Sequence, residues 1–134
     1  MKTKYFIIST ATAFLISNVL TTLWYMMMDG PNYVPFRREE INYGMLMLNH
    51  LLYAGLMVYF YPFFYAKKPS LFEAFTFGAL ISALMFIPQA LVIRSIWTVD
   101  INMIFVLNTI AHLIIGGLMA IMIYFILRKR LMNA

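Results

Sequence analysis

Two histidines lie inside apolar stretches of this 134-residue chain, which has no others. His50 and His112 are 62 positions apart, and each opens an eight-residue segment, HLLYAGLM and HLIIGGLM, in which five positions are identical. Neutral imidazoles at one depth on neighbouring helices can ligate a b-type haem iron from both sides. They can equally exchange hydrogen bonds with nearby polar side chains. These two residues therefore form the centre of the candidate site.

Amide and phenol side chains fall at the same predicted depth as the histidines. Counted from the predicted outer helix ends at about 1.5 Å per residue, they lie near the bilayer midplane or slightly outside it. Polar groups at this depth cost free energy unless they find partners, so we expect them to point into the bundle. The predicted polar core contains, besides the histidines, Asn18, Asn49, Tyr53, Gln89 and Asn108.

Thioether side chains offer a second candidate site, because thioether sulfur and imidazole suit a soft metal such as copper. The methionines predicted in outer halves of the first two spans are Met26, Met27, Met28, Met45 and Met47. The chain has 12 methionines, however, and Met also fills gaps between apolar side chains. Copper binding or transport stays open, as does transport of a small solute by an oligomer.

The sequence gives little support for an enzyme. No carboxylate lies deep within a span, and neither a glycine-rich phosphate loop nor a nucleophile elbow is present. The charged residues predicted at the outer surface are Glu39, Glu40, Arg94 and Asp100. Roles as helix caps and topology charges explain them, although an enzyme acting at that surface stays an alternative.

Four long stretches without charge must position these residues. The predicted transmembrane helices cover residues 5–28, 41–65, 71–93 and 101–127. Even the uncharged run from 74 to 93 reaches about 30 Å as a helix, the thickness of a bilayer's hydrocarbon core. A composition of 63% hydrophobic and 11% charged residues leaves no room for a soluble domain. We therefore expect an all-α integral membrane protein, an antiparallel four-helix bundle in lipid that forms one domain over residues 1–134.

The matching histidine segments also raise the possibility of two tandem helical hairpins, residues 1–66 and 67–134. A chain rich in Leu, Ile and Met produces such matches by chance as well, so both interpretations stay open. In the fourth span, one stripe at four-residue steps contains Asn108, His112, Gly116 and Ala120, and its lower part is smooth enough for close helix contact. The third span offers a similar face in Ala74, Gly78 and Ser82. Pro88 predicts a kink beside Gln89, and Ser70 with Glu73 predicts a capping box.

Basic residues sort to one side of the predicted membrane. Of the ten, seven precede the first span, join the second to the third or follow the fourth: Lys2, Lys4, Lys67, Lys68, Arg128, Lys129 and Arg130. The positive-inside rule makes that side cytoplasmic and places both termini there, in the cytoplasmic membrane of a bacterium. This layout accounts for the net charge of +5 without nucleic acid as a partner.

Together these features predict a non-enzymatic accessory or ligand-binding membrane subunit with a His/Asn polar core in the outer half of its bundle. Because four short helices bury limited surface, we expect association with further copies or with a larger membrane complex. Haem at His50 and His112, copper at the methionines and transport are the alternatives.

Overall fold

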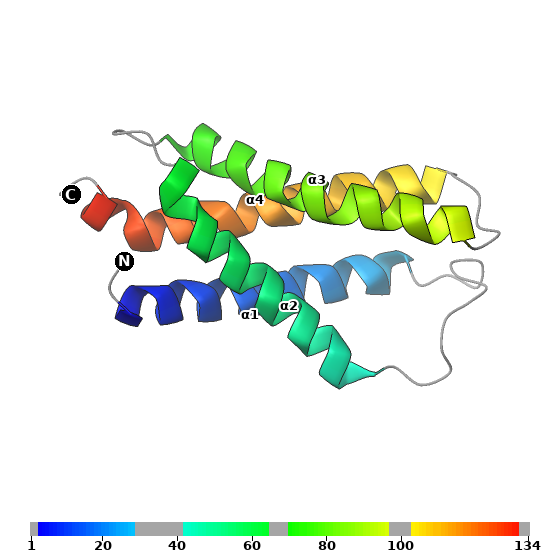
Figure 1. The fold of residues 1–134 in the computed structure, drawn as a ribbon, viewed down its shortest axis with the longest axis horizontal. Helices are drawn as coiled ribbons and strands as arrows, with labels where there is room; N and C mark the ends of the chain where they lie inside the picture. The colour runs from blue at the N-terminus through cyan, green and yellow to red at the C-terminus, as the bar shows by residue number, and fades with distance from the viewer. Residues whose placement is uncertain (1–2, 29–41, 65–69, 97–102, 132–134) are drawn as a thin grey trace.

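In the part of the chain that it describes, residues 3–28, 42–64, 70–96 and 103–131, the computed structural model contains four long α-helices (Figure 1). They are α1 (Thr3–Met28), α2 (Tyr43–Phe60), α3 (Leu71–Ile96) and α4 (Met103–Leu131), and a short 3-10 helix, η1 (Tyr61–Phe64), follows α2. Each long helix, α2 together with η1, is long and apolar enough to cross a membrane. The expected all-helical bundle is therefore confirmed.

Successive helices run in opposite directions, so α1 begins and α4 ends at the same end of the bundle (Figure 1). We call this the terminal end, and the opposite end, where α1 ends and α2 begins, the loop end. The most extensive contact joins α3 to α4, while α1 packs against both α2 and α4. Figure 1 shows α2 crossing the bundle obliquely, whereas α3 and α4 run side by side.

Local side-chain chemistry accounts for where the helices begin. The capping box at α3 is confirmed: the Glu73 amide donates to Ser70 Oγ (3.1 Å), and the Ser70 amide donates to Glu73 Oε2 (2.7 Å). At α2 the cap is Asn42, whose Oδ1 accepts from the Met45 amide (3.1 Å). The α2 helix thus begins two residues after the predicted start of its span.

Proline explains the main difference from the predicted ends. The second span was expected to stay helical to residue 65, but α2 ends at Phe60 and the chain continues as η1. Pro62 has no N–H with which to bond the Val58 carbonyl, so the α-helical ladder cannot pass through it. Pro88 lies within α3, and the helix nevertheless runs on to Ile96.

The interior divides along the bundle axis. Large apolar side chains fill the terminal half, including Met57, Tyr61, Met119, Ile123 and Leu127. Of the buried polar residues, Ser17, Thr21, His50 and His112 lie nearer the loop end, whereas Ser9 lies in the terminal half of α1. Since the outer surface carries many exposed Leu, Ile, Met and Phe side chains, lipid is the natural surroundings for this fold.

Candidate functional site

His50 is held by a hydrogen bond between α1 and α2. Ser17 Oγ lies 2.7 Å from His50 Nδ1, and both residues are buried. Ser17 belongs to a stripe of small residues along α1 that is entirely buried: Ser9, Ala13, Ser17 and Thr21. Small side chains let α2 approach closely enough for the imidazole to reach the hydroxyl. The seryl partner was not among the predicted core residues.

Tyr53, one turn further along α2, connects that helix to α3. Its hydroxyl hydrogen-bonds to Ser82 Oγ, and Ser82 Oγ in turn donates to the Gly78 carbonyl (2.9 Å). Because serine has a single hydroxyl proton, and that of Ser82 is donated to the Gly78 carbonyl, Tyr53 is the donor in its hydrogen bond to Ser82. The Tyr53 ring also contacts Phe86 of α3 edge-on, with centroids 6.0 Å apart. Tyr53 therefore fills the space between two helices whose backbones are not closely packed.

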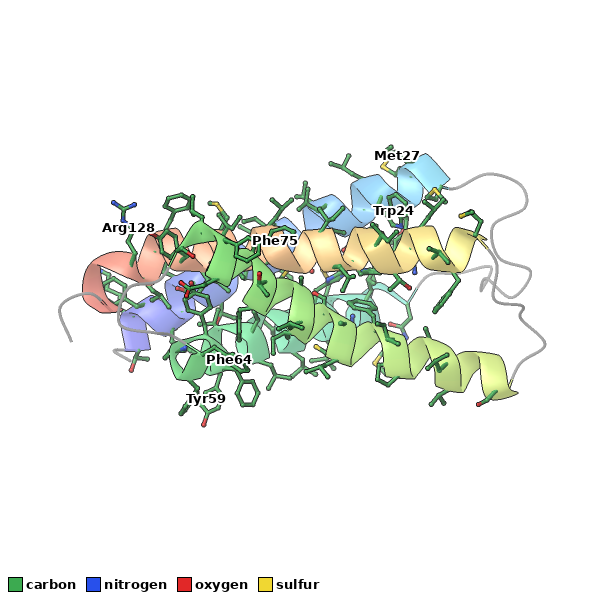
Figure 2. The ribbon with its side chains drawn as sticks, turned by 90° about the horizontal axis from the view of Figure 1, so that it is seen from above. Trp24, Met27, Tyr59, Phe64, Phe75 and Arg128 are labelled. Carbon is green, nitrogen blue, oxygen red and sulfur yellow. The ribbon has the colours of Figure 1, made fainter. Side chains whose placement is uncertain are left out.

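A third hydrogen bond joins α1 to α4 near the loop end. Trp24 Nε1 donates to Asn108 Oδ1 over 2.9 Å, and Figure 2 shows the Trp24 side chain where α1 passes α4. Asn108 was predicted to be in the polar core, whereas Trp24 was not considered as its partner. A tryptophan N–H needs an acceptor when it leaves water, and an in-span amide oxygen is a suitable one.

His112 has a different environment from His50. Its ring stacks on Phe86 with centroids 3.8 Å apart and an interplanar angle of 13°, and Tyr25 contacts it edge-on at 6.3 Å. The residue is only 4% exposed, and its Nε2 has no hydrogen-bond partner among the described residues. A buried nitrogen without a partner is unusual enough to mark this position.

The remaining amides are not brought together with the histidines. Asn18 Nδ2 donates to the Phe14 carbonyl of its own helix (2.8 Å). Asn49 and Gln89 are both exposed on the outside of the single chain, on α2 and α3. Pro88 is exposed beside Gln89, so this part of α3 faces outward and does not turn an amide toward the core.

The candidate copper ligands are spread over the outer surface near the loop end. Met26, Met27 and Met45 are 71%, 80% and 66% exposed, Met47 is exposed as well, and Met28 is half-buried. Figure 2 shows Met27 at the end of α1, pointing away from the bundle. Among the described residues, no group of three or more His, Asp or Glu side chains could hold a metal ion. Glu39, Glu40 and Asp100 lie outside the described residues, as does the side chain of Arg94.

The residues present do not fit a haem between His50 and His112. A macrocycle needs a flat slot between its two axial ligands. Here the Phe86 ring covers one face of His112, and the same ring contacts Tyr53, one turn from His50. A haem would have to displace these aromatic side chains and break the Tyr53–Ser82 hydrogen bond.

Directly beside this cluster, α3 and α4 meet backbone to backbone. A Cβ added to Gly116 would lie 2.6 Å from the Gly78 carbonyl oxygen, and one added to Gly78 would lie 2.7 Å from Ala120 Cβ. Neither glycine can gain a methyl group without the helices moving apart. Of the predicted four-residue stripes, Ala74, Gly78 and Ser82 on α3 and His112, Gly116 and Ala120 on α4 are buried, while Asn108 is half-buried.

An apolar groove opens on the outside of the α1–α4 pair. Its volume is about 410 Å³, and it is lined mainly by Leu, Ile and the flank of Trp24. In a bilayer such a groove holds lipid chains, so it does not by itself indicate a specific ligand. In the part of the chain that the structure describes, the polar residues thus form three cross-helix hydrogen bonds and one aromatic stack.

Comparison with known proteins found no similar one: no family model, curated protein or solved structure matches the chain.

Proposed function

We propose that this protein is a non-enzymatic accessory subunit of a membrane, a rigid helical element that associates with other transmembrane segments. One observation carries the proposal: within the described residues, three pairs of polar side chains bond the helices of the bundle to one another. The bonds Ser17–His50, Tyr53–Ser82 and Trp24–Asn108 join α1 to α2, α2 to α3 and α1 to α4. Polar side chains that form these hydrogen bonds are not available to bind a substrate or to transfer protons.

The test measures both the absorption spectrum and the thermal stability of the purified protein. On this proposal, protein purified in mild detergent is colourless and metal-free, and replacing Ser17 by Ala lowers its thermal unfolding temperature. The expected loss is about 0.6 to 2 kcal/mol, the range of interhelical hydrogen bonds in membranes. A Soret band, or stoichiometric copper in the purified protein, would contradict the proposal and revive the haem or copper alternative.

His112 supports a second candidate function, the binding of a small ligand inside the loop half. The observation in its favour is the buried Nε2, which no described residue bonds, beside the aromatic rings of Phe86 and Tyr25. A ligand with one hydrogen-bonding group and a flat apolar body suits such surroundings. Mass spectrometry of the protein released intact from detergent tests this: a bound molecule in the wild type that is absent from His112→Phe supports the ligand.

We also propose that the terminal end faces the cytoplasm of a bacterial cell. Seven of the ten basic residues belong to the segments at that end. Because the chain has no cysteine, single cysteines can be placed at Lys67 and Glu40 without background. A membrane-impermeant maleimide applied to intact cells should label the cysteine at position 40 only. Labelling at position 67 instead would reverse the orientation.

A further inference from the structure

An outward-facing stripe on α2 carries a polar residue in an otherwise apolar row. Met45, Asn49, Leu52, Leu56 and Tyr59 follow one another at steps of four, three, four and three residues, and all five are exposed. Figure 2 shows Tyr59, the last of them, pointing away from the bundle. The buried side of α2 is the opposite one, which carries His50, Tyr53, Ala54 and Met57. We call the exposed row the α2 stripe.

The spacing of the α2 stripe is that of a helix that packs along its whole length against another helix. Alternating steps of four and three residues repeat every seven residues, which keeps one seam facing a partner in a left-handed pair. The seam could not be recognised from hydrophobicity, because α2 is apolar on all sides. It becomes visible only when the face that its own bundle uses is known.

Asn49 indicates that this seam meets protein and not only lipid. Its neighbours on the stripe are solvated well by acyl chains, but a carboxamide in the hydrocarbon region is costly without hydrogen bonds. No hydrogen bond joins its side chain to another described residue. An amide that both donates and accepts can satisfy a second amide opposite it, so an identical residue is a fitting partner.

We infer that the α2 stripe is the interface with a second copy of this chain, which gives the proposed accessory subunit a defined first partner. Two copies inserted in the same orientation are related by a two-fold axis along the membrane normal, so their α2 helices run parallel. Identical residues then face each other at equal depth. Asn49 pairs with Asn49 of the second copy, as a single buried Asn does in a parallel coiled coil.

Gln89 provides a matched control. It is exposed, and it is the eighth residue counted from the loop end of α3, about as deep as Asn49, the seventh residue of α2. On α3, steps of four and then three residues back from Gln89 reach half-buried Met85 and buried Ser82, so the row that contains Gln89 is not exposed along its length. If any exposed in-span amide promoted association, both residues would matter equally. On our inference only Asn49 does.

Association is measured by sedimentation equilibrium of the full chain in density-matched detergent. Asn49→Leu should raise the dimer dissociation constant about 3- to 30-fold, the range that corresponds to one interhelical polar contact. Asn49→Gln should restore part of the affinity, and Gln89→Leu should leave the constant unchanged. Circular dichroism checks that each variant is folded, which is expected because the Asn49 side chain is exposed. A wild type that is monomeric at micromolar concentrations overturns the inference.

Cross-linking in native membranes then locates the interface. Cysteines introduced at Leu52 or Leu56 should form disulfide-linked dimers on oxidation, whereas a cysteine at exposed Leu51, outside the stripe, should not. Equal cross-linking at positions 51 and 52, or cross-links to other proteins alone, overturns the second copy as the partner. These association experiments do not depend on the hydrogen bonds inside the bundle. If the wild type is monomeric but Ser17→Ala still lowers its thermal stability, the dimer is refuted and the proposed role of the internal hydrogen bonds is retained.

Discussion

The α1–α2 and α3–α4 hairpins each bury one histidine at a similar depth, yet the two helix pairs are held together differently. His50 is the eighth residue of α2 and His112 the tenth of α4, and both helices begin at the loop end. In the first hairpin the imidazole accepts or donates a hydrogen bond across the helix contact. In the second it stacks on Phe86, and the contact itself is made by glycine backbones.

Most corresponding positions of the two histidine segments have the same burial. Positions 50, 53, 54 and 57 are buried, as are the corresponding 112, 115, 116 and 119, while Leu56 and Leu118 are both exposed. Corresponding positions share burial, but two of the buried ones differ in side-chain type: Ala54 corresponds to Gly116 and Tyr53 to Ile115. The tandem duplication stays a prediction. What the comparison teaches is that corresponding residues can share burial while they stabilise their contacts by different forces.

The largest loss of stability is expected when the glycine contact of the second hairpin is broken. Gly116→Ala should destabilise the protein by about 3 kcal/mol, because the added methyl group has no space against Gly78 and Ser82. Gly55→Ala is the matched control in the first hairpin: a Cβ there meets only Thr10 Cγ2, at 4.0 Å. Thermal unfolding in mild detergent measures both. Equal losses would show that the two hairpins do not differ in this respect.

A smaller effect separates the two histidines. His50→Phe should cost about 1 to 2 kcal/mol, because Ser17 loses its partner across the helix contact. His112→Phe should cost less than about 1 kcal/mol, since it keeps a ring to stack on Phe86 and removes a buried nitrogen that no described residue bonds. Unfolding in detergent should rank them in this order. If His112→Phe proved the more damaging, a partner of Nε2 such as a bound ligand would be indicated.

The third expected effect, slightly smaller than that of His50→Phe, concerns the contact between the hairpins. Trp24→Phe keeps an aromatic side chain but removes the donor to Asn108, and we expect a loss of about 0.6 to 1.7 kcal/mol. A double-mutant cycle with Asn108→Leu isolates the pair, because the second substitution should add little once the first is made. Additive losses would mean that the hydrogen bond contributes nothing of its own.

Sequence and structure agree best where the signal is local. Four uncharged stretches predicted the four helices, because only a helix satisfies its own backbone over such a length in lipid. The Ser70–Glu73 capping box involves residues three positions apart, and steps of four residues identified the faces of α3 and α4 that touch. The same rule applied to the first span would have found Ser9, Ala13, Ser17 and Thr21, which are buried in α1.

The sequence by itself thus determined the helices, their antiparallel order and the stripes by which two of them approach. Only the tertiary structure decided the partners: Trp24 with Asn108, 84 positions apart, His50 with Ser17, and Phe86 against His112. It also decided that Asn49 and Gln89, predicted to be in the core, lie outside. The physical reason is that these helices are apolar on every side, so no pattern along the chain specifies how far each is rotated about its axis.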